Sequence, residues 1–398
     1  APDISVKLLV GNKSARINEI SKIESGVYIT SYGTLREDVD EYQNIYFKAC
    51  IIDEAQNIKN PNSLNTKQIK KIEAETKIAL TGTPVENSIT EIWSIFDFIM
   101  PGFLSSLNKF NKKYKFEDID NDARSKLKIL HELISPFILR RKKNEVAKEL
   151  PEKQENNIFI ELSKLQQKYY AVEIQKVREE MDLVIKTDGF KKSKMYILQL
   201  LTKLRQLCID PRLVFTDYNG PSTKIENLLK LVLEIKNNNH KMLLFTSFKK
   251  ALDILKKEFD SNGVSYYVID GTVKAKDRQN LVDDFNNDDT DIFLITLKSG
   301  GTGLNLTSAD VVIHLDLWWN PQAENQATDR AHRIGQKNKV EVIKLIAKGT
   351  IEEKILELQK KKKQLSDNLI EKSDSSNIEL SQLTEEDIKN LITYENVN

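Results

Sequence analysis

The sequence predicts an α/β protein with two parallel-sheet lobes, a helical insertion between them and a long helix after the second lobe. Short, β-rich apolar runs alternate with polar, helix-like stretches in residues 1–85 and again in residues 222–348. Residues 86–221 differ, because they have few glycines and their apolar residues recur at spacings of three and four. The first pattern is typical of buried parallel strands, and the second of packed helices.

The first expected lobe, residues 1–85, contains short apolar runs that each lead into polar or glycine-containing sequence. They are VKLLV (6–10), VYIT (27–30), KACII (48–52) and KIAL (77–80). A strand that is covered on both faces needs no polar face, so its sequence reads as a continuous apolar run. We therefore expect these four runs to be buried parallel strands.

Residues 86–221 are expected to form helical protrusions and the linker to the second lobe. Two stretches within them have an apolar residue at every third or fourth position, which places those residues on one helix face. The first face contains Ile174, Val177, Met181 and Val184, and the second contains Ile197, Leu201, Leu204 and Cys208.

The second expected lobe, residues 222–348, returns to strand–helix alternation. Its strands are KMLLFT (241–246), SYYVID (265–270), IFLIT (292–296), VVIHL (311–315) and VEVIKLIA (340–347). An apolar stripe then predicts a long amphipathic helix over residues 349–372. The polar tail, residues 373–398, should end in a short helix that begins at Thr384.

Composition limits the classes of protein that the chain can belong to. The 398 residues include 60 Lys and Arg and 59 Asp and Glu, so the formal net charge is +1 and any nucleic-acid contact must come from local patches. Cys50 and Cys208 lie far apart in apolar surroundings, as expected of buried free thiols in a reducing compartment. The sequence has no zinc-ligand spacing, no apolar run long enough to span a bilayer and no signal-peptide pattern, so we expect an intracellular protein.

The strongest acidic feature follows the third predicted strand, which ends in Asp53-Glu54-Ala55-Gln56. Two carboxylates at the carboxyl end of a parallel strand suit nucleotide hydrolysis, because ligands of open α/β sheets bind at that edge. Asp53 would hold Mg²⁺ through its water shell, and Glu54 would orient and deprotonate the attacking water. The alternative is an acidic N-cap that follows a strand, and the tetrapeptide alone does not decide between them.

The fourth predicted strand ends in Thr81-Gly82-Thr83-Pro84. Two hydroxyl groups beside a glycine could sense the neighbouring carboxylates and pass movement to another lobe. The alternative is a plain turn without a functional role.

The strand IFLIT leads into a second glycine-containing loop, residues 297–306, in which Gly301 and Gly303 would let backbone N–H groups approach a phosphate. Its alternative is a flexible surface loop.

The segment WWNPQAENQATDRAHRIGQ, residues 318–336, carries an amide and two guanidinium groups at spacings of four and three. On a continuous helix, Gln326, Arg330 and Arg333 would share one face. Guanidinium groups suit a γ-phosphate whose negative charge must be stabilised during transfer. An exposed, solvated helix face is the alternative.

Taken together, these segments resemble the ordered motifs of the Swi/Snf family of helicase superfamily two. The matching segments are VYITSYGTL, IIDEAQNIKN, LTGTP, PFILRRKKNEV, LRQLCIDPRLV, MLLFTSF, SGGTGLNL, QATDRAHRIGQ and GTIEEKILELQKKKKQL. The resemblance covers all but about the last 25 residues. It implies two RecA-like lobes that use ATP and Mg²⁺ to translocate along double-stranded DNA without separating its strands, and a brace helix after the second lobe.

The resemblance also implies roles for individual residues. Asp53 is the Mg²⁺-associated carboxylate and Glu54 the catalytic base, while Gln326, Arg330 and Arg333 complete the ATP site. Positions that match or adjoin the family's DNA track are Thr30, Ser31, Ser247, Lys298 and Trp319. The alternatives are that Ser247 caps a helix and that Trp319 belongs to a core. The partners implied are duplex DNA and a DNA-bound protein cargo, with the motor acting as a monomer and without a membrane.

One expected motif is missing, the phosphate-binding loop GxxxxGK[ST]. The closest segment, Gly11-Asn12-Lys13-Ser14, lacks the upstream glycine and the glycine directly before lysine. We therefore expect an incomplete first lobe and a truncated, hydrolysis-deficient piece of an active DNA-dependent ATPase. The alternatives are a natural non-hydrolysing module that binds DNA or a partner, and a scaffold or protein-remodelling role.

Overall fold

The computed structural model describes residues 3–82, 89–114, 121–139, 141, 143–147, 149–300, 303–369 and 384–392. The chain divides into two compact units, Ala1–Arg140 and Arg141–Asn398. Each unit contains parallel β-structure, two two-stranded sheets in the first and one six-stranded sheet in the second, and has its own apolar clusters, so the predicted α/β fold class is confirmed. The predicted domain boundaries at residues 86, 222, 349 and 373 stay predictions.

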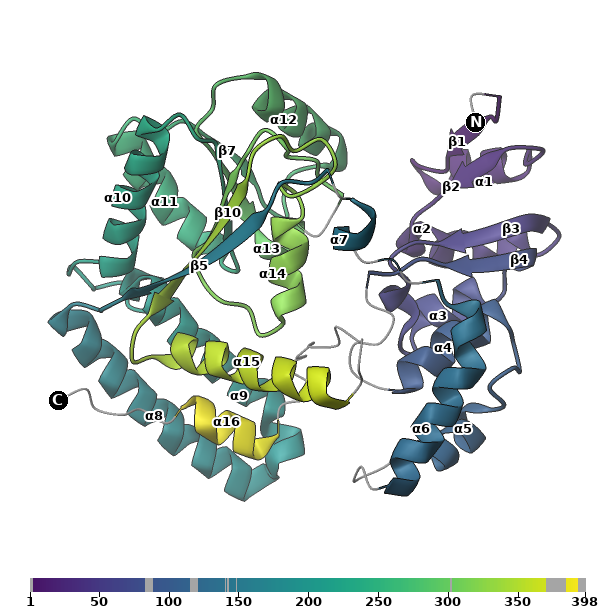
Figure 1. Ribbon diagram of the computed structural model, residues 1–398, viewed down its shortest axis with the longest axis horizontal. Coiled ribbons are helices and arrows are strands. Elements are labelled where there is room, and N and C mark those ends of the chain that lie inside the picture. The colour runs from purple at the N-terminus through teal and green to yellow at the C-terminus, as the bar shows by residue number, and fades with distance from the viewer. Residues whose placement is uncertain are drawn as a thin grey trace. The chain divides into compact units, whose positions relative to one another are not determined.

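The sheets of the first unit are formed by the four strands expected there. Strand β1 (Val6–Leu8) pairs in parallel with β2 (Val27–Ile29), and β3 (Tyr46–Ile52) pairs in parallel with β4 (Glu73–Ala79). The helices between them are α1 (Lys13–Ile20), α2 (Tyr32–Asp38) and α3 (Leu64–Ile69), with the 3-10 turns η1 (Val39–Tyr42) and η2 (Ala55–Ile58). Figure 1 shows β3 and β4 side by side above α3 and α4.

One face of these sheets packs on a core, and the other is open. Leu9, Ile20, Leu35, Ile52 and Phe98 are among the buried members of the core cluster. The apolar side chains on the open side are Val6, Leu8, Val27, Ile29, Ile51 and Ile78, which are 41–62% exposed. The expectation that these strands are buried on both faces is therefore wrong within the described residues, because the helices of this unit cover one face.

The other elements described in the first unit are helical, as predicted. Helices α4 (Ile89–Ile99), α5 (Leu107–Tyr114) and α6 (Asn121–Ile134) are followed by the 3-10 turn η3 (Ser135–Phe137). Their apolar faces meet in a cluster that contains Trp93, Phe96, Phe110 and Leu130.

The second unit is built on a six-stranded parallel sheet of order β5-β10-β9-β6-β8-β7, as far as the described residues extend (Figure 1). The strands are β5 (Lys153–Ile160), β6 (Met242–Thr246), β7 (Tyr266–Ile269), β8 (Ile292–Thr296), β9 (Val311–His314) and β10 (Val340–Ala347). All five strands expected here are present. Strand β5 is an addition, because it comes from the stretch 86–221 that was expected to be helical and joins the sheet edge beside β10.

Alternate side chains of this sheet face two different helical layers. Met242 and Leu244 pack with α10 (Thr223–Asn237) and α11 (Lys249–Ser261). Leu243 and Phe245 point to the opposite face, where they pack with α12 (Ala275–Asn287) and α14 (Pro321–Thr328). Because a strand buries both of its faces here, its sequence shows no polar alternation.

A separate helical layer contains α8 (Lys164–Asp188), α9 (Phe190–Ile209), α15 (Ile351–Leu369) and α16 (Glu385–Leu391), which lie together in Figure 1. The two predicted apolar faces on α8 and α9 meet in one cluster with Ile351 and Ile355 of α15. Thr384 caps α16 as predicted, since its side chain accepts a hydrogen bond from the Asp387 N–H. The remaining short helices are α7 (Lys143–Val146), α13 (Leu297–Gly300) and the 3-10 turn η4 (Pro211–Leu213).

The two cysteines are unpaired but differ in burial. Cys208 is buried on α9, where loss of hydration raises the pKa of its thiol, whereas Cys50 on β3 is half-buried. The prediction of a buried thiol is thus right for Cys208 and wrong for Cys50. In the part of the chain that the structure describes, no helix is long and apolar enough to cross a membrane, and no cluster of three or more His, Cys, Asp or Glu suits a metal ion.

Candidate functional site

Strand β3 delivers Asp53 and Glu54 to its carboxyl end, as the sequence predicts. The Tyr32 hydroxyl donates to the Asp53 carbonyl oxygen at 2.9 Å, and the Glu54 N–H donates to Asp53 Oδ1 at 2.8 Å. Glu54 occupies the N-cap position of η2, but its side chain makes no capping hydrogen bond. The Glu54 side chain therefore does not cap the turn, and Asp53 is exposed at the sheet edge.

The backbone of Glu54 has φ 49° and ψ 54°, in the left-handed region that non-glycine residues seldom adopt. Its carboxylate accepts a hydrogen bond from Gln56 Nε2 at 2.5 Å, and the side-chain oxygen of Gln56, Oε1, accepts one from the Thr81 hydroxyl at 3.0 Å. This relay of side chains joins the ends of the adjacent strands β3 and β4. Strain of this kind persists only where the surroundings fix it, which is typical of functional sites.

The relay brings together two of the predicted motifs, the acidic strand end and the Thr81-Gly82 loop. Gln56 was named in the tetrapeptide but given no role, although an amide two residues after a candidate base could have indicated one. Gly82 is exposed, and Thr83 lies outside the described residues. A displacement of the Glu54 carboxylate can therefore be transmitted to Thr81 through the side chain of Gln56 alone.

Two other candidates of the first unit follow β2. Ser31 is exposed, and its hydroxyl caps α2 by accepting a hydrogen bond from the Thr34 N–H at 3.1 Å. The Thr30 hydroxyl oxygen is buried and has no hydrogen-bond partner in the described part of the structure. Ser31 thus has a local structural role, while Thr30 retains unused hydrogen-bonding capacity.

In the second unit, the carboxyl ends of β6 and β8 carry Ser247 and Lys298. The Ser247 hydroxyl accepts a hydrogen bond from Arg205 at 3.1 Å, and its N–H donates to Asp316 at 2.9 Å. Ser247 does not cap the helix that follows, because Phe248 occupies the N-cap position of α11. Lys298 is exposed on α13 and directs a positive charge to solvent near this edge.

Trp319 was also expected near the DNA track, and the structure buries its side chain. Its side chain is 2% exposed and packs in the apolar cluster of the helical layer with Leu317 and Ile351. Its ring also lies 5.5 Å from the Arg205 guanidinium carbon. A buried indole with these neighbours stabilises the core, which is the alternative that the sequence left open.

The glycine-containing loop after β8 is packed tightly at its start. A Cβ atom at Gly300 would lie 2.8 Å from the Phe245 ring, so only glycine fits that close approach. Gly303 has φ +32°, and Gly301 lies outside the described residues. Further along, the Leu306 N–H donates to the Arg330 carbonyl oxygen at 3.0 Å. This loop and the arginine-bearing segment therefore form one unit at the sheet edge.

The expectation that Gln326, Arg330 and Arg333 share one helix face is wrong. Helix α14 ends at Thr328, and the chain continues in turns with bonds such as Arg330 N–H to Ala327 O at 3.1 Å. Gly335, with φ +105°, then reverses the chain. Gln326 and Arg330 are half-buried and Arg333 is exposed, so the guanidinium groups are presented by a turn and not by a helix.

Two contacts that the sequence did not suggest hold this turn in place. The Gln336 side-chain amide donates to the carbonyl oxygens of Thr307, Ala309 and Ala331 at 2.8–3.2 Å. The Lys143 ammonium of α7 donates to Asp329 Oδ1 at 2.6 Å and to the His332 carbonyl oxygen. The turn that carries Arg330 and Arg333 is therefore fixed on both sides before any ligand binds.

A parallel sheet with an acidic strand end in one unit, and a glycine loop bonded to an arginine turn in the other, are features of helicase-like ATPases. Comparison with protein families agrees: the model of the SNF2-related domain matches residues 1–213, and that of the helicase conserved C-terminal domain matches residues 223–335. The chain belongs to the SNF2 family, and the predicted pair of RecA-like lobes is confirmed.

Proteins similar to this chain occur in bacteria, in archaea and in eukaryotes. The chain is 40% identical to an uncharacterized ATP-dependent helicase of Mycoplasma pneumoniae, over 93% of the chain and 35% of that protein. It is 38% identical to a putative ATP-dependent helicase/translocase of Bacillus subtilis, over 99% of the chain and 43% of that protein. The Sulfolobus solfataricus SWI2/SNF2 ATPase core solved in complex with dsDNA is 34% identical, with a TM-score of 0.51 over 99% of this chain and 82% of that one. The chain thus spans less than half the length of the two bacterial relatives.

Proposed function

We propose that the protein to which this chain belongs is an ATP-dependent translocase on double-stranded DNA that does not separate the strands. The observation that carries the proposal is the relay from Glu54 through Gln56 to Thr81, because it couples a candidate base to a loop on the next strand. The similarity to a putative helicase/translocase and to an ATPase core solved with dsDNA supports the same function. We propose that it acts as a monomer on a DNA-bound protein cargo.

Within this proposal, Glu54 orients the attacking water and accepts its proton. Its strained backbone and its bond from Gln56 fix the carboxylate before ATP binds. Asp53 would hold Mg²⁺ through water, and Mg²⁺ would neutralise charge on the phosphates. A single exposed carboxylate fits that ion, because Mg²⁺ keeps several waters and is usually held by one or two carboxylates and the substrate's own phosphates.

The candidate cationic groups for this proposed chemistry lie in the second unit. Arg330 and Arg333 are candidates to stabilise negative charge on the transferred phosphoryl group, as guanidinium groups do in related reactions. Gln326 and the backbone near Gly301 and Gly303 would complete the binding of the phosphates. The contacts from Lys143 and Gln336 support these roles, since a charge-stabilising group must be held in place before the reaction.

We propose that four residues contact the phosphate backbone of the DNA. They are Thr30 and Ser31 in the first unit and Ser247 and Lys298 in the second. Hydroxyl groups and lysines are common phosphate contacts that carry no sequence information. The open hydrogen-bonding capacity of Thr30 and the exposure of Lys298 support this assignment. Because such binding releases counterions, affinity for duplex DNA should fall steeply with added salt.

We further propose that the 398-residue chain alone does not hydrolyse ATP. It contains no GxxxxGK[ST] loop, the motif that binds the α- and β-phosphates in related ATPases. The exposed apolar side chains of β1–β4, such as Val6, Leu8 and Ile51, support this idea, because an open sheet face of this kind normally packs against further structure. The activity would then belong to a longer protein that supplies the missing loop.

The test is ATP hydrolysis by that longer protein with duplex DNA, with single-stranded DNA and with no nucleic acid. We expect duplex DNA to raise the rate by at least about tenfold, which corresponds to ~1.4 kcal/mol of activation free energy, and single strands to have little effect. The 398-residue chain, tested in parallel, should show no turnover. Equal stimulation by single and double strands would contradict duplex translocation, and turnover by the chain itself would contradict its proposed deficiency.

A further inference from the structure

Arg205, on α9, is a buried cation of the second unit's helical layer that has three hydrogen-bond acceptors. Its side chain is 2% exposed. One terminal nitrogen donates to Asp316 Oδ2 at 2.7 Å, to the Leu317 carbonyl oxygen at 2.7 Å and to the Ser247 hydroxyl at 3.1 Å. Its guanidinium therefore contacts the two loops that follow strands β6 and β9, although it belongs to neither.

Asp316 completes the connection between these loops. Its second oxygen, Oδ1, accepts hydrogen bonds from the Thr246 hydroxyl at 2.8 Å and from the Ser247 N–H at 2.9 Å. Both the backbone and the side chain of Ser247 are thus held by the Arg205–Asp316 pair. The side chain of Asp316 is fully buried, so water does not compete for these bonds.

Aromatic rings fix the orientation of the guanidinium. Its central carbon lies 5.2 Å from the ring centre of Phe248, 5.0 Å from that of Trp318 and 5.5 Å from that of Trp319. A planar guanidinium can stack on such rings and donate hydrogen bonds at its rim at the same time, which an ammonium group cannot do. The surrounding rings therefore select arginine and not merely a positive charge.

Burial of the Arg205–Asp316 pair has a free-energy cost that limits its contribution to folding. Arg205 Nε is buried and has no hydrogen-bond partner in the described part of the structure. A buried ion pair often contributes no more to folding than apolar residues of the same volume, and each unsatisfied donor adds a cost. The cluster does, however, set the geometry of Ser247, which lies at the carboxyl edge of the sheet where ligands of such folds bind.

We propose that Arg205 is a positioning residue for duplex DNA. Acting with Asp316, it holds the Ser247 loop in the conformation that contacts the DNA phosphates, and it ties that loop to α9 of the helical layer. The inference rests on the proposed DNA contact of Ser247. It predicts that Arg205 and Ser247 act as one unit in DNA binding.

The test is a double-mutant cycle on the 398-residue chain, with affinity for a short fluorescein-labelled duplex measured by anisotropy at low salt. The variants are Arg205→Lys, Ser247→Ala and the double variant, with Arg205→Gln in reserve if the lysine variant does not fold. Thermal unfolding of each variant is recorded alongside. Leu228→Ala, which truncates a fully buried side chain of α10 in the core cluster behind the sheet, controls for loss of stability alone.

We expect Arg205→Lys and Ser247→Ala each to weaken DNA binding by about tenfold, or ~1.4 kcal/mol. The affinity of the double variant should be no lower than that of the single variant with the lower affinity. Leu228→Ala should bind like the unmodified chain. The inference would be overturned if the two losses multiply, if Ser247→Ala leaves affinity unchanged, or if Leu228→Ala weakens binding as much as Arg205→Lys. Failure of the unmodified chain to bind duplex DNA would overturn the proposed DNA contact and this inference together.

Discussion

Replacing Glu54 by glutamine is expected to lower the duplex-stimulated ATPase rate of the longer protein by a factor of about 10²–10⁴, the usual contribution of a general base. The amide keeps the size of the side chain, and its oxygen can still accept the hydrogen bond from Gln56. It cannot accept a proton from water, so ATP binding should persist while hydrolysis stops. The measurement is steady-state phosphate release together with the affinity for ATP.

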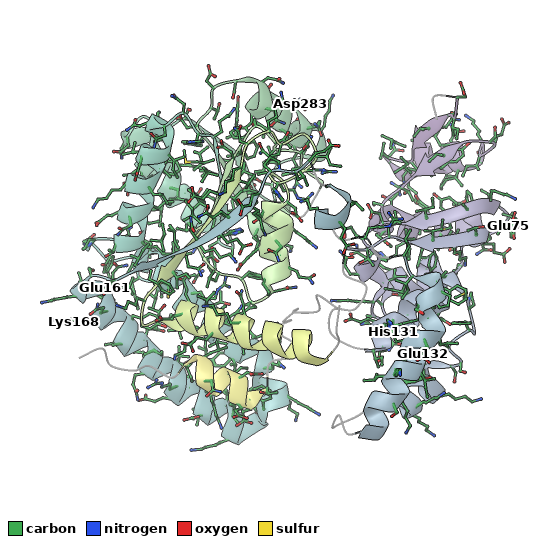
Figure 2. The ribbon with its side chains drawn as sticks, viewed as in Figure 1. Glu75, His131, Glu132, Glu161, Lys168 and Asp283 are labelled. Atoms are coloured by element: carbon green, nitrogen blue, oxygen red, sulfur yellow. The ribbon has the colours of Figure 1, made fainter. Side chains whose placement is uncertain are left out.

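The matched control is Glu75→Gln on the neighbouring strand β4. Glu75 is exposed in the middle of that strand, where it pairs with Lys48 at 2.6 Å, and Figure 2 labels it beside the strands of the first unit. This substitution removes the same charge from the same unit but not from the carboxyl edge. We expect the rate to stay within about twofold of the unmodified protein, less than 0.5 kcal/mol. A Glu54→Gln variant as active as this control would exclude Glu54 as the base.

The second large effect concerns the buried ion pair that fixes α15 to α10 within the second unit. Lys224 Nζ lies 2.7 Å and 2.6 Å from the two carboxylate oxygens of Glu352, and both side chains are fully buried. Burial raises the pKa of Glu352, which Lys224 opposes. Lys224→Met should therefore lower the free energy of unfolding of this unit by about 3–5 kcal/mol, because it leaves a buried carboxylate without its cation.

Urea unfolding of the 398-residue chain, followed by circular dichroism, measures this loss. Lys348→Met is the control, because its partner Glu161 lies 3.0 Å away on the surface, where such pairs contribute about 0–1 kcal/mol. Adding Glu352→Gln to Lys224→Met should restore much of the lost stability, since no charge then remains buried without a partner. Equal losses in Lys224→Met and Lys348→Met would show that the buried pair does not anchor α15.

The strands of the six-stranded sheet were predictable because a strand that is buried on both faces has a continuous apolar sequence. The runs at 242–246, 292–296 and 311–314 are almost purely apolar, and each is a central strand of the sheet. Strand β5 was missed because KQENNIFI is largely polar, as an edge strand can be. The prediction of a helix that carries Arg330 and Arg333 was wrong for a different reason. Residue spacing does not show that the helix ends at Thr328, before the turn at Gly335.

The site was predictable where its residues are adjacent in sequence and follow a strand, as Asp53 and Glu54 do. It was not predictable where it depends on distant contacts. The bond from Thr81 to Gln56 spans 25 residues, that from Arg205 to Asp316 spans 111, and that from Lys143 to Asp329 spans 186. Such pairs are brought together only by the folded sheet, so no local pattern marks them. Trp319 is ambiguous in sequence for the same reason, because an aromatic residue beside a motif can serve a core or a ligand.

The measurement that tests the proposed function most directly is triplex displacement by the longer protein. A third strand bound to a duplex is released when a translocase passes beneath it, and a strand-separating helicase also splits the duplex. We predict ATP-dependent release of the third strand with the duplex intact, and no release by the Glu54→Gln variant. Separation of the duplex strands, or ATP hydrolysis without release of the third strand, would contradict translocation along double-stranded DNA.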